Sequence, residues 1–280
     1  MGVVEWFLGI HFSWRITSTS VAVHLNQSGF AANLVESFFQ DSRNATPSAT
    51  PYRSGVPIDS IAPSTDDDDS PSQLRRTAAY QSLIGSIGWL SCSIRPDLSA
   101  VHSFLASYSN KPSVGHMKAA LYALHYIHST DHYGITFTSE SDAPMHCCIH
   151  FPPSNDVEAY TDPQPPTPTT SSTLSSYSDA CWGSKIGSAV ADGTLLPLFK
   201  FRSMSGGIVF RNGRPVGWLP ERQERTSLSS CEAEIRATNA TSKKVVDFCN
   251  ICKSMVESGH NLSDLESPTL LFNENDACVK

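Results

Sequence analysis

The sequence lacks an apolar run long enough to cross a bilayer, and its N-terminus lacks the charged-then-apolar order of a secretory signal. These absences predict an intracellular protein, cytoplasmic or nuclear, with no membrane partner. The eight cysteines show no framework spacing. They lie mostly within apolar patterns, which predicts reduced, buried thiols in place of disulfides.

Excess positive charge is also lacking. The net charge of −7 over 280 residues argues against a protein that coats nucleic acid generally. A local basic region nevertheless lies between residues 200 and 225, while acid is concentrated in the Asp66–Asp69 run. An apolar content of 40% in a chain of this length predicts one or two cores and hence two modest domains.

Two cysteine-containing motifs are candidate metal sites. Cys249 and Cys252 form a single CxxC on a helical pattern without a second pair, so core packing is favoured over metal binding. The run from His146 to His150 (HCCIH) is the sharper candidate. Alternate residues of an extended segment point to opposite faces, however, and a plain strand or insertion is favoured there too.

Residues 1–138 predict a small helix-rich unit with a few strands. Apolar runs at 5–12 and 20–25 indicate a hairpin, and a helix follows with Phe30, Leu34 and Phe38 on one face. Residues 41–72 are rich in Pro, Ser, Thr and Asp, which predicts a mobile acidic loop. Three helical patterns then run from about 73 to 93, 101 to 108 and 116 to 128, and a strand is predicted at 133–137.

Residues 139–173 contain the run PQPPTP, which predicts an extended linker before a second domain at 174–280. That domain begins with a strand ending near Asp179. Two strands at 206–210 and 215–219 are joined at an Asn-Gly turn, a long helix starts near Ser229, and a buried strand covers 269–272. An acid at a strand end and another in the first turns of a helix are components of a metal-dependent nuclease site.

A set of short motifs is distributed along nearly the whole chain. The first half contains residues 6–10 (WFLGI), 80–90 (YQSLIGSIGWL), 95–97 (RPD) and 124–127 (LHYI), with Pro112 and His116. The second half contains residues 177–183 (YSDACWG), 202–206 (RSMSG), Trp218 and 229–234 (SSCEAE). In this order the motifs resemble copia-type LTR retrotransposon polyproteins, namely the region after the reverse transcriptase palm and the RNase H domain that follows it.

The resemblance implies an α/β (α+β) fold: an RNase H-like mixed sheet with helices, preceded by a helical thumb or connection unit. The sheet would begin with three antiparallel strands, continue into the long helix and end with a parallel strand. No Tyr-x-Asp-Asp motif occurs, so DNA synthesis is not expected of this chain. Compared with the family, the chain is expected to be truncated at both ends, with its RNase H-like domain incomplete at the C-terminus.

The resemblance further implies that two Mg²⁺ (or Mn²⁺) ions are held by Asp179, Glu234 and Glu274 for cleavage of the RNA strand of an RNA–DNA hybrid. Hard cations of this kind prefer carboxylate oxygens. Glu232 fits an S-x-x-E capping box that starts at Ser229, so Glu234 is favoured as the ligand. Glu274 is one methylene longer than the family's aspartate, and Asp276 remains an alternative third ligand.

Arg202, Arg211, Arg214 and Arg222 are candidate phosphate contacts, and solvated surface cations are the alternative interpretation. The leading hypothesis is a retrotransposon polyprotein fragment whose parent activity is RNase H-type hydrolysis. The remainder of the parent polyprotein would be its partner. The main alternative is a catalytically inactive relic that at most binds nucleic acid, and a metal-binding module at the run from His146 to His150 is a third hypothesis.

Overall fold

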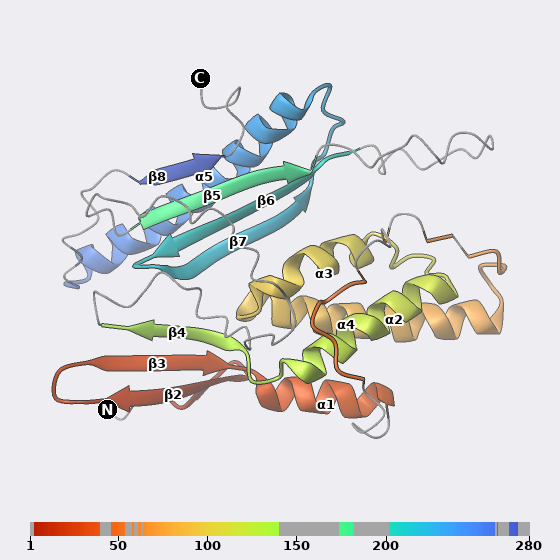
Figure 1. The fold of residues 1–280 in the computed structure, drawn as a ribbon, viewed down its shortest axis with the longest axis horizontal. Coiled ribbons are helices and arrows are strands. Elements are labelled where there is room, and N and C mark those ends of the chain that lie inside the picture. Colours follow the sequence, from red (N-terminus) through yellow and green to blue (C-terminus); the bar gives the residue numbers. More distant parts are fainter. Residues whose placement is uncertain are drawn as a thin grey trace, which may run out of the picture. The chain divides into compact units, whose positions relative to one another are not determined.

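The computed structural model describes residues 3–39, 46–53, 58, 61–62, 64–139, 174–181, 202–260, 262 and 269–273. The chain divides into two compact units, Met1–Ser139 and Glu140–Lys280 (Figure 1). The predicted linker therefore lies mostly outside the described residues.

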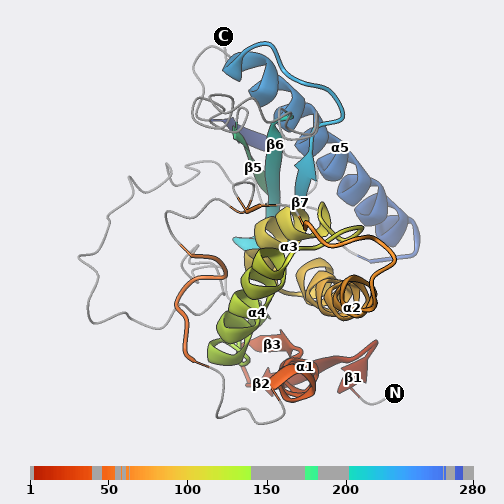
Figure 2. The ribbon, with the colours of Figure 1, turned by 90° about the vertical axis from the view of Figure 1, so that its right-hand side faces the viewer.

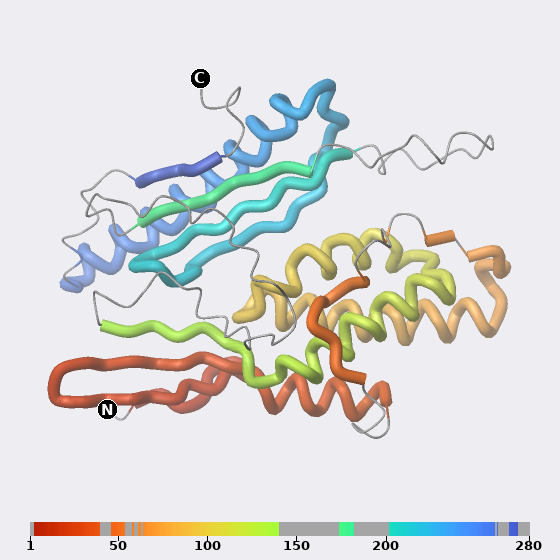
Figure 3. The backbone as a smooth tube through the Cα atoms, in the orientation of Figure 1, coloured from red at the N-terminus to blue at the C-terminus, as the bar shows by residue number. Residues whose placement is uncertain are grey.

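The first unit carries a four-stranded antiparallel sheet in the order β1-β2-β3-β4. Its strands are β1 (Trp6–Phe7), β2 (Ile10–Ile16), β3 (Val21–Asn26) and β4 (Gly134–Thr138). Although β4 is more than a hundred residues away in the chain, it pairs with β3 along its whole length (Figure 3). The sequence-based hairpin is present, but its first strand begins at Ile10 because the chain turns at Leu8 and Gly9, where φ is 50° and 75°.

Helices α1 (Ser28–Phe39), α2 (Pro71–Ser93), α3 (Ser99–Ala106) and α4 (Val114–Ser129) form the rest of this unit, with a 3₁₀ turn η3 at Pro96–Leu98. Two of them begin at serine N-caps. The Ser70 hydroxyl accepts the Gln73 backbone N–H, and Ser113 exchanges hydrogen bonds with His116 in a capping box. Proline at the first position of α2 also suits a helix start.

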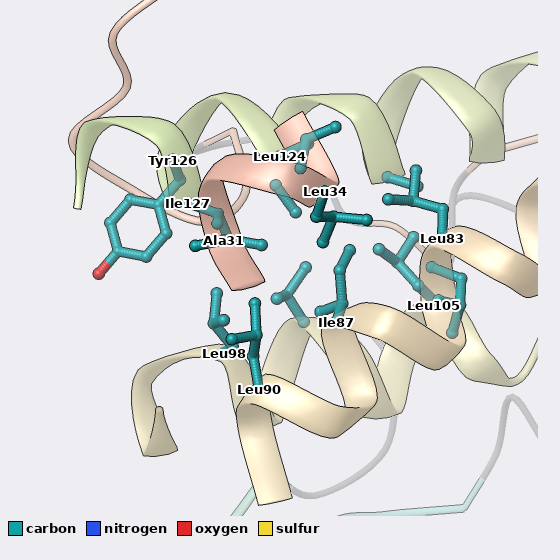
Figure 4. Close-up of a cluster of buried hydrophobic side chains, with 14 of the residues drawn as sticks. Ala31, Leu34, Leu83, Ile87, Leu90, Leu98, Leu105, Leu124, Tyr126 and Ile127 are labelled. Carbon is teal, nitrogen blue, oxygen red and sulfur yellow. The ribbon is translucent and has the colours of Figure 1, made fainter. Parts of the chain in front are cut away.

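The core of the unit lies between α1, α2, α3 and α4 (Figure 4). The predicted stripe on α2 is confirmed, because Tyr80, Leu83 and Ile87 are fully buried there. Gly88 allows a close approach of α3: a Cβ atom on it would lie 2.6 Å from Nε2 of His102. Ile58, from the segment predicted as a mobile loop, also packs into this core.

A buried charged network ties the end of α2 to the end of α4. Arg95 is 2% exposed and donates Nε and Nη2 to the two carboxylate oxygens of Asp97, at 2.9 and 2.7 Å. The same guanidinium donates to the Thr130 carbonyl and hydroxyl at 2.9 and 2.7 Å. The Tyr126 hydroxyl donates to Asp97 at 2.9 Å. The RPD motif at residues 95–97 therefore ends α2 and also connects it to the end of α4.

The second unit is a mixed sheet in the order β7-β6-β5-β8 with α5 along one face (Figure 2). Its elements are β5 (Leu174–Cys181), β6 (Met204–Arg211), β7 (Arg214–Arg222), α5 (Ser230–Glu257) and β8 (Leu270–Asn273). Strands β5, β6 and β7 pair antiparallel, and β8 returns parallel to β5. The predicted order of the strands and the α/β fold class are confirmed. The prediction of a buried last strand is wrong, because β8 is only partly buried and Leu271 is exposed.

Glycine sets the contact between α5 and this sheet. A Cβ atom on Gly207 of β6 would lie 2.2 Å from the Thr241 hydroxyl oxygen of α5, so only glycine lets the helix approach this closely. The tight turn between β6 and β7 is the predicted Asn-Gly pair, with φ of 49° at Asn212 and 70° at Gly213.

Candidate functional site

A polar cluster joins β5, α5 and β8 where α5 begins. We define it as Ser178, Glu234, Thr238 and Asn273. The side-chain Nδ2 of Asn273 lies 3.0 Å from Oε2 of Glu234, 3.1 Å from the Ser178 hydroxyl, 3.2 Å from the Thr238 hydroxyl and 3.3 Å from the Ser178 carbonyl. The Ser178 and Thr238 hydroxyls are also 3.0 Å apart. One amide therefore connects three elements of the unit.

The orientation of the Asn273 amide follows from its neighbours. The Glu234 carboxylate and the Ser178 carbonyl accept hydrogen bonds and cannot donate them. An amide oxygen at the same place would face both acceptors without a hydrogen. The nitrogen must point into the polar cluster, and Asn273 acts there as a donor.

Glu234 is 5% exposed and lies on the side of α5 that packs on the sheet, beside Ala233 and Ala237 at 0%. The start of α5 is held there by Gln223, whose side-chain amide nitrogen donates to the Ala233 carbonyl and the Ser205 hydroxyl at 2.8 and 3.0 Å. A carboxylate so buried requires compensating donors or positive charge. Asn273 supplies one such donor.

Asp179 lies one residue beyond Ser178 on β5 and is exposed. In the register of the sheet it is opposite Gly206. Successive side chains of a strand point to opposite faces, and Ser178 is the one that contacts α5. The backbone carbonyl of Ser178 thus belongs to the polar cluster, while the Asp179 carboxylate is open to solvent.

Glu232 has the predicted structural role. Its backbone N–H donates to the Ser229 hydroxyl at 3.1 Å, and its carboxylate accepts the Leu228 N–H at 2.8 Å, one residue earlier than the capping box would place it. The Leu228 hydrogen bond, followed by that from Arg236, lowers the pKa of Glu232. Glu234, two residues further, is left to the polar cluster.

The register of the sheet separates the four candidate arginines into two pairs. Arg222 is opposite Met204 and lies, with Arg202, at the end of the sheet that holds Asp179. Arg211 and Arg214 are opposite each other at the other end of the sheet. Seven residues of β6 separate this end from Met204, which corresponds to about 23 Å. Arg214 is only 5% exposed, and Arg211 donates to the Cys252 sulfur at 3.4 Å.

The remaining candidates divide between described and undescribed positions. Glu274, Asp276 and the run from His146 to His150 lie outside the described residues. The described cysteines are free thiols, as predicted, but only Cys252 on α5 is buried, and Cys92 and Cys181 are exposed. Within the described parts of the chain, no group of three His, Cys, Asp or Glu side chains is placed to hold a metal ion.

The described residues by themselves do not fit the pair of divalent ions expected from the sequence. The buried carboxylate oxygen Oε2 of Glu234 faces an amide N–H of Asn273. That nitrogen cannot ligate a cation, because an amide NH₂ group only donates hydrogen bonds and its lone pair is delocalised into the carbonyl, and Mg²⁺ and Mn²⁺ prefer oxygen ligands.

Sequence reasoning missed Ser178, Thr238 and Asn273. Ser178 was passed over beside Asp179, and Thr238 is one turn beyond Glu234 on the helix. Asn273 offered the clearest signal, because it is a polar residue at the end of an apolar strand that runs parallel to β5. The carboxyl ends of parallel strands gather functional side chains in α/β folds.

Comparison with known proteins gives three relatives. The chain is 24% identical over 272 residues to the retrovirus-related Pol polyprotein from transposon RE2 of Arabidopsis thaliana, covering 97% of this chain and 14% of the polyprotein. The corresponding polyprotein from transposon RE1 is 23% identical over 206 residues, 74% of this chain and 11% of the polyprotein. The chain is related to retrotransposon Pol polyproteins.

A third relative of this Pol-related chain is the protein named Secreted RxLR effector protein 161 from Plasmopara viticola. It is 27% identical over 171 residues, which are 61% of this chain and 92% of that protein. No family model matches the chain, and no solved structure matches it. Among the described residues, no helix combines the length and the apolar character needed to cross a membrane.

Proposed function

We propose that the second unit of this Pol-related chain is an RNase H-like module, and that the parent activity is hydrolysis of the RNA strand of RNA–DNA hybrids. The observation that supports the proposal is the chain path: three antiparallel strands, a long helix and a parallel strand beside the first. This is the order expected from the family resemblance. The remainder of a Pol polyprotein is the context in which such a module would act.

In the parent enzyme of this proposal, Mg²⁺ or Mn²⁺ would be held by acidic residues at the positions of Asp179, Glu234 and Glu274. Asp179 is open to solvent at the end of β5, and Glu234 is fixed at the start of α5. Arg202 and Arg222 lie at the same end of the sheet and are the best placed of the four arginines to meet a phosphate backbone near these acids. Such contacts are independent of sequence.

A second candidate function is binding of the hybrid without cleavage. The contact between Asn273 and Glu234 supports it, because the buried carboxylate is held by an amide. Phosphate binding by surface arginines does not depend on that carboxylate. A chain that has lost hydrolysis would therefore keep salt-sensitive binding.

Cleavage and binding are separated by two assays on the full chain. The first measures cutting of a labelled RNA–DNA hybrid in Mg²⁺ or Mn²⁺ by the natural chain, Asp179→Asn and Glu274→Asp. Cutting that Asp179→Asn abolishes supports hydrolysis by this chain. Cutting only after Glu274→Asp assigns the defect to the longer side chain, and no cutting by any of the three rejects hydrolysis.

The second assay measures hybrid binding against salt concentration for two matched arginine variants of β6 and β7. Arg222→Ala should weaken binding and reduce the slope of log affinity against log salt by about one, the value for one lost phosphate contact. Arg211→Ala, at the far end of the sheet, should change neither as much. Equal effects would contradict the placement of the substrate at the Asp179 end.

A further inference from the structure

The Asn273 amide is surrounded by more acceptors than it has hydrogens. Two hydrogens on Nδ2 face four oxygen atoms at 3.0 to 3.3 Å, from Ser178, Glu234 and Thr238. Two of those oxygens, the Glu234 carboxylate and the Ser178 carbonyl, can only accept. The nitrogen therefore lies where converging oxygens would otherwise favour a positive charge.

From this arrangement we infer that Asn273 is a positioning residue that holds Glu234 and keeps divalent cations out of the polar cluster. The inference rests on the proposed function, in which the parent enzyme uses the acid at position 234 as a cation ligand. An amide N–H partly neutralises the carboxylate and fixes its rotamer without any ion. The polar cluster of this chain is thus a hydrogen-bonded joint between β5, α5 and β8.

Replacing the Asn273 amide by a carboxylate of the same shape turns the hydrogen-bond donor of the polar cluster into an acceptor. In Asn273→Asp an oxygen would take the place of the nitrogen that lies 3.0 Å from Glu234 and 3.3 Å from the Ser178 carbonyl. Two negative charges and a carbonyl dipole would then face one another, which is unfavourable unless a cation or a shared proton lies between them. The same oxygens form the hard ligand set that Mg²⁺ and Mn²⁺ prefer.

Mn²⁺ titration of the full chain, with free Mn²⁺ followed by electron paramagnetic resonance, tests the inference without nucleic acid. Asn273→Asp should bind Mn²⁺ at least about tenfold more tightly than the natural chain, which corresponds to about 1.4 kcal/mol from the added carboxylate ligand. Adding Glu234→Gln to Asn273→Asp should remove the gain. Asn250→Asp makes the same chemical change on the exposed side of α5 and should match the natural chain.

Asn273→Ala covers the case in which the aspartate variant does not fold. It removes the donor without adding charge, so Mn²⁺ affinity should rise above that of the natural chain and the rise should depend on Glu234. Mn²⁺ should also raise the melting temperature of either folded variant and leave that of the natural chain unchanged.

Two outcomes would overturn the inference. One is a natural chain that binds Mn²⁺ as tightly as Asn273→Asp and loses that binding with Glu234→Gln. The other is a folded Asn273 variant with no gain over the natural chain. Mn²⁺ binding and the melting temperature can be measured whether or not the chain cleaves the hybrid. The cleavage assay therefore tests the proposed function separately from this inference.

Discussion

Replacing Arg95 by methionine should destabilise the first unit more than an ordinary surface substitution. The guanidinium is almost wholly enclosed, with 3% of its side chain exposed, and the Asp97 side chain that it pairs with is 8% exposed. Methionine fills a similar length but donates nothing. It would leave the Asp97 carboxylate buried without its cation and the Thr130 carbonyl without its 2.9 Å donor.

The size of the effect follows from what is left unpaired. Breaking one partner of a buried ion pair costs about 3–5 kcal/mol. Domains of this size are stable by only about 5–15 kcal/mol, so Arg95→Met should remove a large part of the stability of the unit. Adding Asp97→Asn removes the orphaned charge and keeps an acceptor for Tyr126, and should recover about 1–4 kcal/mol.

Native-state hydrogen exchange of the full chain, read on peptides from α2 and α4, is the suitable assay because it reports on this unit alone. Protection of both peptides should fall together in Arg95→Met and partly return in the double variant. A loss below about 1 kcal/mol, the scale of an exposed pair, would refute the reasoning. So would single and double variants whose effects simply add, because residues in one network are expected to couple.

Three further predictions concern other contacts. Burial lowers the pKa of His102, so below about pH 6.5 this side chain takes up a proton in the unfolded chain but stays neutral in the folded chain. The stability of the natural chain should therefore fall as the pH drops through this range. The difference between its urea midpoints at pH 7 and pH 5 should be smaller in His102→Gln. Gly207→Ala places a methyl group on the Thr241 hydroxyl and should cost about 1–3 kcal/mol, with partial rescue by Thr241→Ala in thermal melts. Glu232→Ala removes the acceptor of the Leu228 N–H and should speed hydrogen exchange in the first turn of α5, with the exposed Glu257→Ala as control.

Sequence patterns located the elements of the second unit because each pattern is local. The Asn212-Gly213 pair predicts a tight turn from its own backbone preferences, and the structure has positive φ at both residues. The Ser229 cap predicts the start of α5 in the same way. Its buried face is formed by Ala233, Glu234, Ala237, Thr241 and Cys252 and is not an apolar stripe that spacing could reveal. The parallel return of β8 came from the family resemblance, since pattern alone does not give strand order.

Asn273 at a strand end is a local signal, but the polar cluster as a whole could not be predicted because it depends on register between distant segments. Ser178 and Asn273 are 95 residues apart, and a shift of one residue in the pairing of β5 with β8 would exchange which side chains face α5. The break at Leu8 and Gly9 was missed for a different reason. An apolar run looks continuous in sequence, whereas the turn there is a property of two backbone angles.

The buried Glu234 connects the fold with the proposed chemistry. A carboxylate that is 5% exposed at the start of a helix must be compensated, either by a cation or by hydrogen-bond donors, or the helix end would leave the sheet. In this chain Asn273 provides a donor, and Gln223 and the Gly207–Thr241 contact hold α5 in place independently. The fold can therefore persist without an ion, so the stability of this unit and the proposed hydrolysis of RNA are separable properties.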